Sequence, residues 1–273
     1  MRITTLGYTL AAALLWGAVP AQAQILIWNL PQEDGAWVKF EGAYTQTQAR
    51  PESNAGDEVL KWRSELTITS VGQTQATFQG AEVPCRWVEF KSVTRVEALE
   101  KPPGPGGTYL YKVLIPESKV IGKPVDDTGI PVTFLPIVKG YRKVSQRDVE
   151  PVSDRVLAVY PTIALLTYYP DLQADESQGG ELPLKVSNDP VPVRVFKGSR
   201  LLQDKMSRSK NSGVLWLTDT LPFGLARYQV SVTREERGLT SQANEFRRTS
   251  LIEVDMSAVA SGNDGRSELP DNN

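Results

Sequence analysis

Apolar and polar residues alternate along most of the chain with a period of two, the pattern of a strand buried on one face. The clearest case starts at Trp62, which shares a face with Leu66 and Ile68 while charged or hydroxyl residues fill the positions between them. Comparable or shorter strand-like segments occupy residues 36–45, 74–80, 108–115, 191–197, 214–218, 226–233 and 250–256. The sequence therefore predicts a mainly β fold, either a curved antiparallel sheet (a half-barrel) or a sandwich.

Two segments interrupt this pattern. Residues 71–73 (VGQ) predict a hairpin turn between flanking strands. Residues 154–169 are apolar on most sides, which fits either a buried strand pair broken at Pro161 or a kinked helix with Ser153 or Asp154 as its N-cap. We expect one short helical segment here, crossing the sheet.

The first residues have the three parts of a secretory signal peptide. Arg2 is basic, residues 6–19 are uncharged and largely apolar, and residues 21–23 (AQA) form a small-x-small cleavage site. We expect residues 1–23 to be removed and the chain to be exported to the periplasm or the extracellular space. No later run of 18 apolar residues occurs, so we expect no transmembrane segment after cleavage.

The rest of the chain reads as one domain followed by a tail. Residues 100–107 are rich in Pro and Gly and cannot continue a strand, but a single sheet with a long loop is simpler than two domains. We expect one mainly β domain over residues 24–257. Residues 258–273 are small, polar and acidic, and we expect a disordered tail there.

Composition narrows the possible chemistry. The 273 residues include no His and one Cys, which excludes Ser-His-Asp and Cys-His catalysis, thiolate zinc sites and an internal disulfide. The net charge of −2 argues against a nucleic-acid binder held by a basic field. We expect no cofactor and no resident metal.

The remaining catalytic candidates are weak. Cys85 lies in a predicted strand and fits a buried, unreactive thiol better than a nucleophile. Ser207 and Lys210 have Ser-x-x-Lys spacing, which is productive only on a helix, whereas this stretch is polar and lies between strands. Asp126 and Asp127 have the sequence context of a surface turn.

Carboxylates alone could still support hydrolysis or calcium binding. Glu41 and Glu89 could converge as a glycosidase-like pair, although a sequence cannot show it. Asp171 and Asp175 could join Asp126 and Asp127 around calcium, but no loop has EF-hand spacing. A solvated loop is the simpler interpretation of these acidic residues.

Two tryptophans break the polar side of the predicted sheet. Trp37 alternates in phase with Lys39 and opposite to Val38, and Trp87 is in phase with Glu89. Aromatic side chains among charges on a half-solvated sheet surface form a candidate ligand site. We therefore predict Trp37 and Trp87 as ligand-binding residues, the alternative being a second buried face.

Three short motifs carry a family resemblance: WVKFEG at 37–42, CRWVEFK at 85–91 and LPFGLA at 221–226. In this order they resemble uncharacterised secreted bacterial proteins of planctomycete type. More remotely, they are similar to the superfamily of outer-membrane lipoprotein carriers and sorting proteins. That resemblance implies a curved half-barrel holding acyl chains, although residues 100–107 and 116–151 are long inserts. It assigns no site residues.

These observations predict an exported, non-catalytic protein of the cell envelope. Its expected ligand is a lipid, a lipoprotein or another apolar partner held in a groove of the sheet. The alternatives are an envelope hydrolase that uses carboxylates and a purely structural β-sandwich module.

Overall fold

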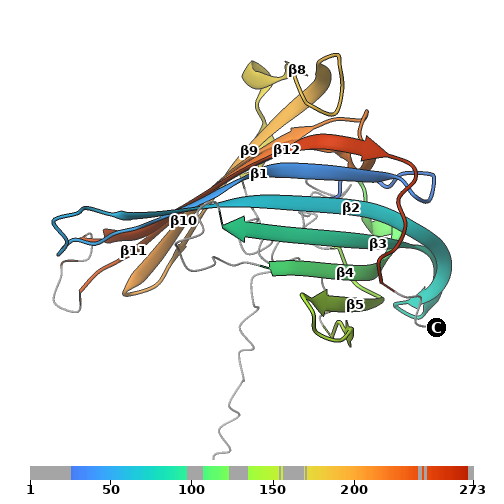
Figure 1. Cartoon of the computed structure of the whole chain (residues 1–273), viewed down its shortest axis with the longest axis horizontal. Helices are drawn as coiled ribbons and strands as arrows, with labels where there is room; N and C mark the ends of the chain where they lie inside the picture. Colours follow the sequence, from blue (N-terminus) through green and yellow to red (C-terminus); the bar gives the residue numbers. More distant parts are fainter. Residues whose placement is uncertain are drawn as a thin grey trace, which may run out of the picture.

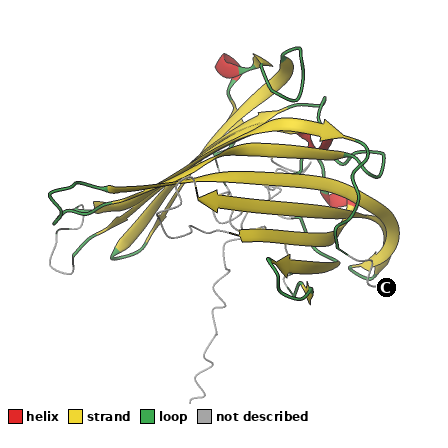
Figure 2. Cartoon of the chain, in the orientation of Figure 1, coloured by secondary structure: helices red, strands yellow, loops and turns green. Residues whose placement is uncertain are grey.

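The computed structural model describes residues 26–96, 107–122, 135–153, 155, 169, 171–238, 242 and 245–269 (Figure 1). These residues form one open antiparallel sheet of twelve strands, with three single-turn 3₁₀ segments (Figure 2). The prediction of a mainly β, antiparallel fold is confirmed, and the strands belong to a single sheet.

The strands, in chain order, are β1 (Trp37–Gln48), β2 (Glu58–Phe78), β3 (Ala81–Val96), β4 (Gly107–Pro116), β5 (Lys139–Val144), β6 (Glu150–Pro151), β7 (Gln173–Ala174), β8 (Gly180–Leu182), β9 (Val191–Gln203), β10 (Ser207–Leu217), β11 (Leu225–Glu236) and β12 (Arg247–Gly262). The 3₁₀ segments are η1 (Glu117–Lys119), η2 (Glu176–Gln178) and η3 (Pro222–Gly224).

The sheet order is β6-β5-β4-β3-β2-β1-β12-β11-β10-β9-β7, and β8 pairs separately with β9. Most neighbours in space are also neighbours in sequence, as expected for hairpin connections. There are two exceptions: at one edge β7 pairs with β9, and in the middle of the sheet β1 pairs along its whole length with β12. The first and the last long strands of the described chain therefore lie side by side.

Alternation along the strands separates an apolar core face from a polar outer face. In β1, Val38 and Phe40 are fully buried, whereas Lys39 and Glu41 lie on the opposite side. The same phase continues across the sheet through the paired positions of β2, β3, β11 and β12. The core includes Leu66, Ile68, Val88, Phe90, Val113, Ile115, Tyr228, Val230, Val254 and Met256.

Segments outside the strands cover part of the core face. The backbone N–H of Trp28 donates to the carbonyl of Phe223 at 2.9 Å, and the Trp28 ring stacks on Phe196. Tyr169 lies over Gly198 and Gly213, where an added Cβ would come within 2.5 Å of the Tyr169 Cβ and within 2.7 Å of its ring, respectively. Glycine at both positions therefore makes room for this buried ring.

The predicted turn at residues 71–73 is wrong. β2 runs without interruption from Glu58 to Phe78, and its pairing with β3 shifts register between Ser70 and Gly72. This is a β-bulge, the other structure that an isolated glycine in a strand marks. The hairpin turn lies further on, at Gln79 and Gly80, which have φ of 53° and 85°.

The expected disordered tail is wrong over residues 258–269. Residues 258–262 continue β12, and Leu269 is only 2% exposed. Small residues such as Ala258 can continue the ladder because backbone hydrogen bonds, rather than side-chain bulk, define it. The predicted signal peptide (1–23) lies outside the described residues, as does nearly all of the expected helical segment (154–169).

One end of the sheet projects beyond the core as an arm. There the ends of β1, β2 and β9–β12 continue to pair beyond the core. These paired ends include Gln48 of β1, Ser250 of β12, Arg234 of β11 and Leu202 of β9. Figure 1 shows this arm extending to the left of the body. Its tip leaves Leu201 and Leu202 exposed by 58% and 40%.

A buried arginine closes the opposite end of the core. Arg86 is 4% exposed, and its guanidinium contacts Asp34 at 3.1 Å, Glu117 at 3.0 Å and Ser70 Oγ at 2.9 Å. A guanidinium buried to this degree is tolerated only when its donors are paired. Here it ties β2 and β3 to the segment before β1 and to η1.

We predict that Arg86→Met lowers the free energy of unfolding by about 1–3 kcal/mol, because the buried Ser70 hydroxyl and the partly buried Glu117 carboxylate lose their hydrogen-bond donor. Arg142→Met is the matched control, because Arg142 pairs with Glu150 at the surface, where an ion pair contributes at most about 1 kcal/mol. Urea unfolding measures both variants. Equal losses would contradict a structural role for the Arg86 network.

Candidate functional site

Trp37 and Trp87 both lie on the outer face, as the alternation predicts. Cross-strand pairing places Trp37 opposite Thr69, Thr69 opposite Glu89, and Glu89 opposite Lys112. Trp87 precedes Glu89 by two residues on β3, so its side chain lies on the same face. The two indoles are therefore brought to one surface but remain separated by β2.

Each indole has its own polar neighbours. Trp37 Nε1 donates to Asp264 Oδ1 at 2.9 Å, and this bond is the main reason that the pKa of Asp264 lies below its ordinary value. Trp87 stacks on Tyr141 with ring centroids 6.2 Å apart, and Lys112 Nζ lies 5.6 Å from its ring centre.

The chain itself crosses the surface between them. Residues 263–269, which we call the C-terminal strap, leave β12 and run across β1, β2 and β3 toward β4 (Figure 1). Gly265 lets the strap lie flat, because a Cβ there would come within 2.6 Å of Thr69 Cγ2 and 2.9 Å of Gly35 O. The strap therefore occupies the surface predicted for a ligand.

Glu89 is the anchor of the C-terminal strap. Its carboxylate is 4% exposed and accepts the backbone N–H groups of Glu268 at 2.9 Å and Leu269 at 3.2 Å. Ser267 Oγ, 2.7 Å from Glu89 Oε2, also donates to it. Charge-assisted bonds of this kind are about twice as strong as neutral ones.

Two lysines also bind the strap. Lys112, 2% exposed, directs its Nζ to the carbonyl of Leu269 at 3.5 Å. Lys91 Nζ pairs with the Glu268 carboxylate at 2.7 and 2.8 Å. The strap is thus held through backbone donors, a backbone acceptor and one acidic side chain.

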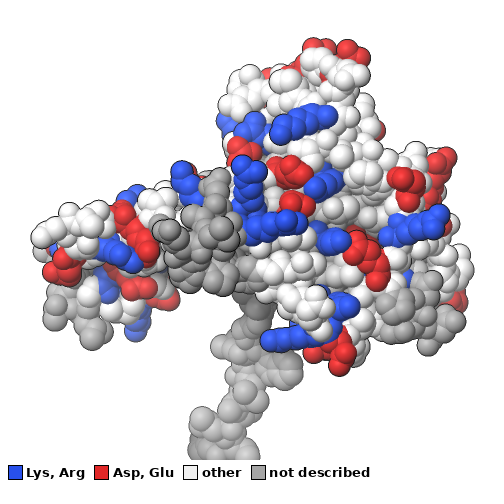
Figure 3. Space-filling view, in the orientation of Figure 1, with Lys and Arg blue, Asp and Glu red and all other residues white. Residues whose placement is uncertain are grey.

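A polar groove of about 250 Å³ runs beside the strap. Its lining residues are Lys39, Glu65, Thr67, Thr69, Glu89, Lys91, Val93, Arg266 and Glu268. Lys39 Nζ lies 2.7 Å from Glu41 and 3.1 Å from Glu65, and its hydrogen bond to Glu41 is the main cause that raises the pKa of Lys39. In Figure 3, basic and acidic side chains are interspersed over this face. Such a lining suits a polar ligand rather than a fatty acyl chain.

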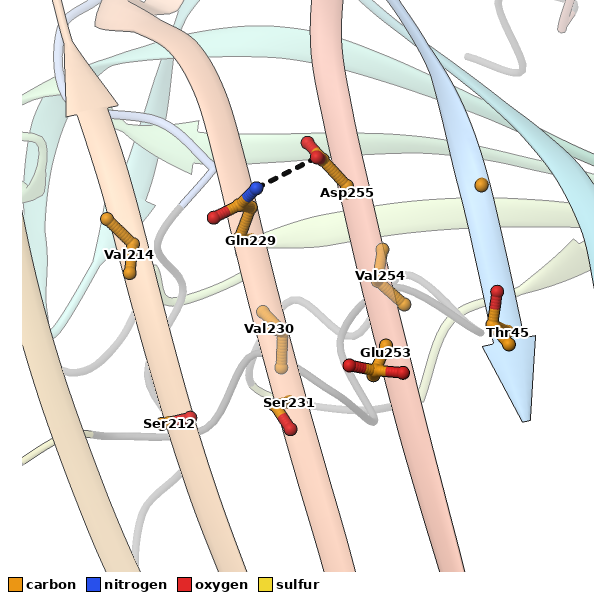
Figure 4. A pocket seen from close by; sticks show the side chains of 10 residues that line it. Thr45, Ser212, Val214, Gln229, Val230, Ser231, Glu253, Val254 and Asp255 are labelled. Atoms are coloured by element: carbon orange, nitrogen blue, oxygen red, sulfur yellow. Dashed lines mark hydrogen bonds between the residues drawn. The ribbon is translucent and has the colours of Figure 1, made fainter. Parts of the chain in front are cut away.

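A second, wider hollow of about 370 Å³ lies further along the outer face, over β1, β12, β11 and β10 (Figure 4). Short side chains such as Ala43 and Ser212 leave the space open. At its edge Asp255 accepts bonds from Arg227 and Gln229. Burial raises the pKa of Asp255, but these bonds more than offset it, so the pKa lies below its ordinary value.

The residues considered as catalytic candidates either point to opposite faces of the sheet or are buried in the fold. Ser207 and Lys210 lie on β10, where residues three apart face opposite sides, and they contact Asp204 and Glu235 respectively. Cys85 is buried, and burial raises the pKa of its thiol, so it lacks the thiolate character of a nucleophile.

The acidic candidates also do not converge. Glu41 and Glu89 are two strands and four residues apart in register, about 16 Å by strand geometry, which is too far for a glycosidase pair. Asp171 binds Ser199 and Asp175 pairs with Lys197. Asp126 and Asp127 lie outside the described residues. Within the described part of the chain, no group of three or more metal-ligating side chains is found.

Sequence reasoning missed Lys112 and the C-terminal strap. Lys112 is a charged position in an otherwise apolar strand, a signal of a special environment. Leu269 is the one large apolar residue after Met256 apart from Val259, and it is buried by 98%. An isolated leucine in a polar tail was therefore the available sign that the tail docks.

No helix in the described residues is long and apolar enough to cross a membrane. A scan against protein-family models finds no match to this sequence, and a search of curated proteins likewise finds none.

Proposed function

We propose that this chain is an exported, non-catalytic protein of the cell envelope that binds a protein or lipoprotein partner on its outer face, in the groove beside the C-terminal strap. One observation carries the proposal. The groove beside the C-terminal strap joins paired charges and threonine hydroxyls on one face of the sheet, the kind of lining that fixes the orientation of a polar ligand.

The packing of the apolar face of the sheet favours a polar partner over a free lipid as the ligand. Core-face side chains of β1, β2, β3 and β11 pack against each other and against the segment that starts at Leu26. The groove, in contrast, carries Lys39, Lys91 and Arg266 next to carboxylates. A lipoprotein would therefore be recognised through its polypeptide rather than through its acyl chains.

Native mass spectrometry of the full-length protein, mildly extracted from the cells that produce it, tests this proposal. We expect an additional mass, identified as polypeptide by fragmentation in the spectrometer. Lys91→Ala should reduce its occupancy at least fivefold, whereas Lys210→Ala on the arm should leave it unchanged. A bare chain would overturn the proposed envelope partner, and an adduct indifferent to Lys91 would overturn the assignment of the groove.

A lipid adduct would count for the acyl-carrier alternative and against the polar groove.

A further inference from the structure

The outer face already holds a stretch of polypeptide by its backbone. Glu89 accepts the amides of Glu268 and Leu269, and Lys112 approaches the Leu269 carbonyl. Backbone groups are common to every sequence, so these three contacts would be the same for any extended chain lying on the same path. The side chains around them are what could discriminate between chains.

Glu89 and Lys112, the two charged residues that anchor the strap, are buried, although holding a permanently docked tail does not require buried charges. Glu89 and Lys112 are 4% and 2% exposed, on neighbouring strands of the polar face. Well-packed apolar residues would fix a permanent tail at least as well, because burying charges carries a large desolvation cost. A carboxylate and an ammonium at this spacing instead match the N–H and C=O groups of a polypeptide.

Building on the proposed function, we infer that this surface is a binding site for an extended polypeptide of the partner, and that the C-terminal strap is its built-in occupant. The partner's segment takes the path of residues 263–269 and displaces the strap, so that Arg266 and Glu268 leave the groove while Lys39, Glu65, Glu89 and Lys91 still line it. The strap therefore acts as an internal competitor that keeps the buried Glu89 carboxylate hydrogen-bonded while no partner is bound.

The contacts of the strap define the chemistry that the site prefers. Lys91 selects an acidic side chain at the position of Glu268. The next position takes an apolar side chain, since Leu269 is almost completely buried. A residue without a Cβ is favoured where Gly265 lies against Thr69. The site therefore suits a flexible segment that contains an acidic residue followed by an aliphatic one.

A labelled synthetic peptide with the sequence of residues 263–269 (NDGRSEL) tests the inference by fluorescence anisotropy on the full chain. In Leu269→Asp the strap would bury a second carboxylate beside Glu89, so we expect it to leave the surface. The peptide should then bind at least tenfold tighter to Leu269→Asp than to the wild type. Glu89→Gln added to Leu269→Asp should reverse this gain.

A second release variant, Glu268→Pro, removes the amide that donates to Glu89 and should give the same gain. A charge exchange checks the contact to Lys91. The variant Lys91→Glu with Leu269→Asp should prefer a peptide with Lys at the acidic position (NDGRSKL) over the original. Circular dichroism confirms that each variant keeps its β signal.

Absence of peptide binding in both release variants would overturn the inference and leave the strap as a fixed part of the fold. The proposed function is judged independently, because the native mass spectrum of the wild type shows whether a partner is carried at all. A partner adduct without peptide binding would reject backbone recognition only. Peptide binding with a bare native chain would reject the envelope partner only.

Discussion

Gly42→Ala is expected to lower the free energy of unfolding by about 3 kcal/mol or more. A Cβ at this position would overlap the carbonyl oxygen of Asp255 and lie 2.8 Å from Met256 Sδ. The carbonyl belongs to the backbone of β12, which is fixed by its ladders to β1 and β11, so no side-chain rotation relieves the overlap. Chemical denaturation followed by tryptophan fluorescence measures the loss.

The sign of this effect is informative. In an ordinary strand, alanine is more favourable than glycine by about 0.5–1 kcal/mol. Gly179→Ala is the matched control, because Gly179 has φ −69° and its nearest new contact would be 3.7 Å away. We expect that control to be neutral or slightly stabilising. A tolerated Gly42→Ala would mean that β1 and β12 are less closely apposed than described.

Glu89→Gln is expected to release the C-terminal strap while leaving the sheet folded. The amide keeps the size of the carboxylate but loses its charge and one of its two accepting oxygens, so the N–H groups of Glu268 and Leu269 lose charge-assisted bonds. Hydrogen bonds to a charged group contribute about 1.5–3 kcal/mol each. Loss of one such bond corresponds to roughly 10–100-fold faster amide exchange.

Hydrogen–deuterium exchange of the peptide that covers residues 263–269 measures this release. Glu41→Gln is the control: Glu41 lies on the same face but is solvent-exposed, and its partner Lys39 also pairs with Glu65. Exchange in the strap should be unchanged in that variant. If Glu89→Gln also leaves exchange unchanged, the carboxylate is not the anchor. If it unfolds the whole sheet, the strap is not an independent element.

The strands were predictable because their signal is local. Alternation at residues 36–45 and 62–70 separates the two faces of β1 and β2, and the structure keeps that phase. The position of the turn was not predictable in the same way, because Gly72 is compatible with a bulge as well as with a hairpin. The choice between them depends on pairing with β3, a partner that the local sequence does not specify.

The site was predictable only in part, for a related reason. The alternation of apolar and polar residues is enough to place Trp37 and Trp87 on the polar face, the face that also carries Glu89. What covers that face depends on the C-terminal strap, whose polar composition has the statistics of disorder. The strap is ordered by a few specific contacts to Glu89, Lys91 and Lys112, and composition does not register contacts of that kind.

The pairing of β1 with β12 has a consequence for the order in which the chain folds. This ladder joins residues 37–48 to residues 250–262, so the middle of the sheet forms between segments separated by some two hundred residues. Contacts of such long sequence separation are slow to form, because the entropy of closing the loop is lost before the contact stabilises the chain. While β12 is still being synthesised, β1 has only one of its two neighbours and exposes an open edge. Chaperones that shield strand edges would therefore act most usefully on this protein just before its last long strand emerges.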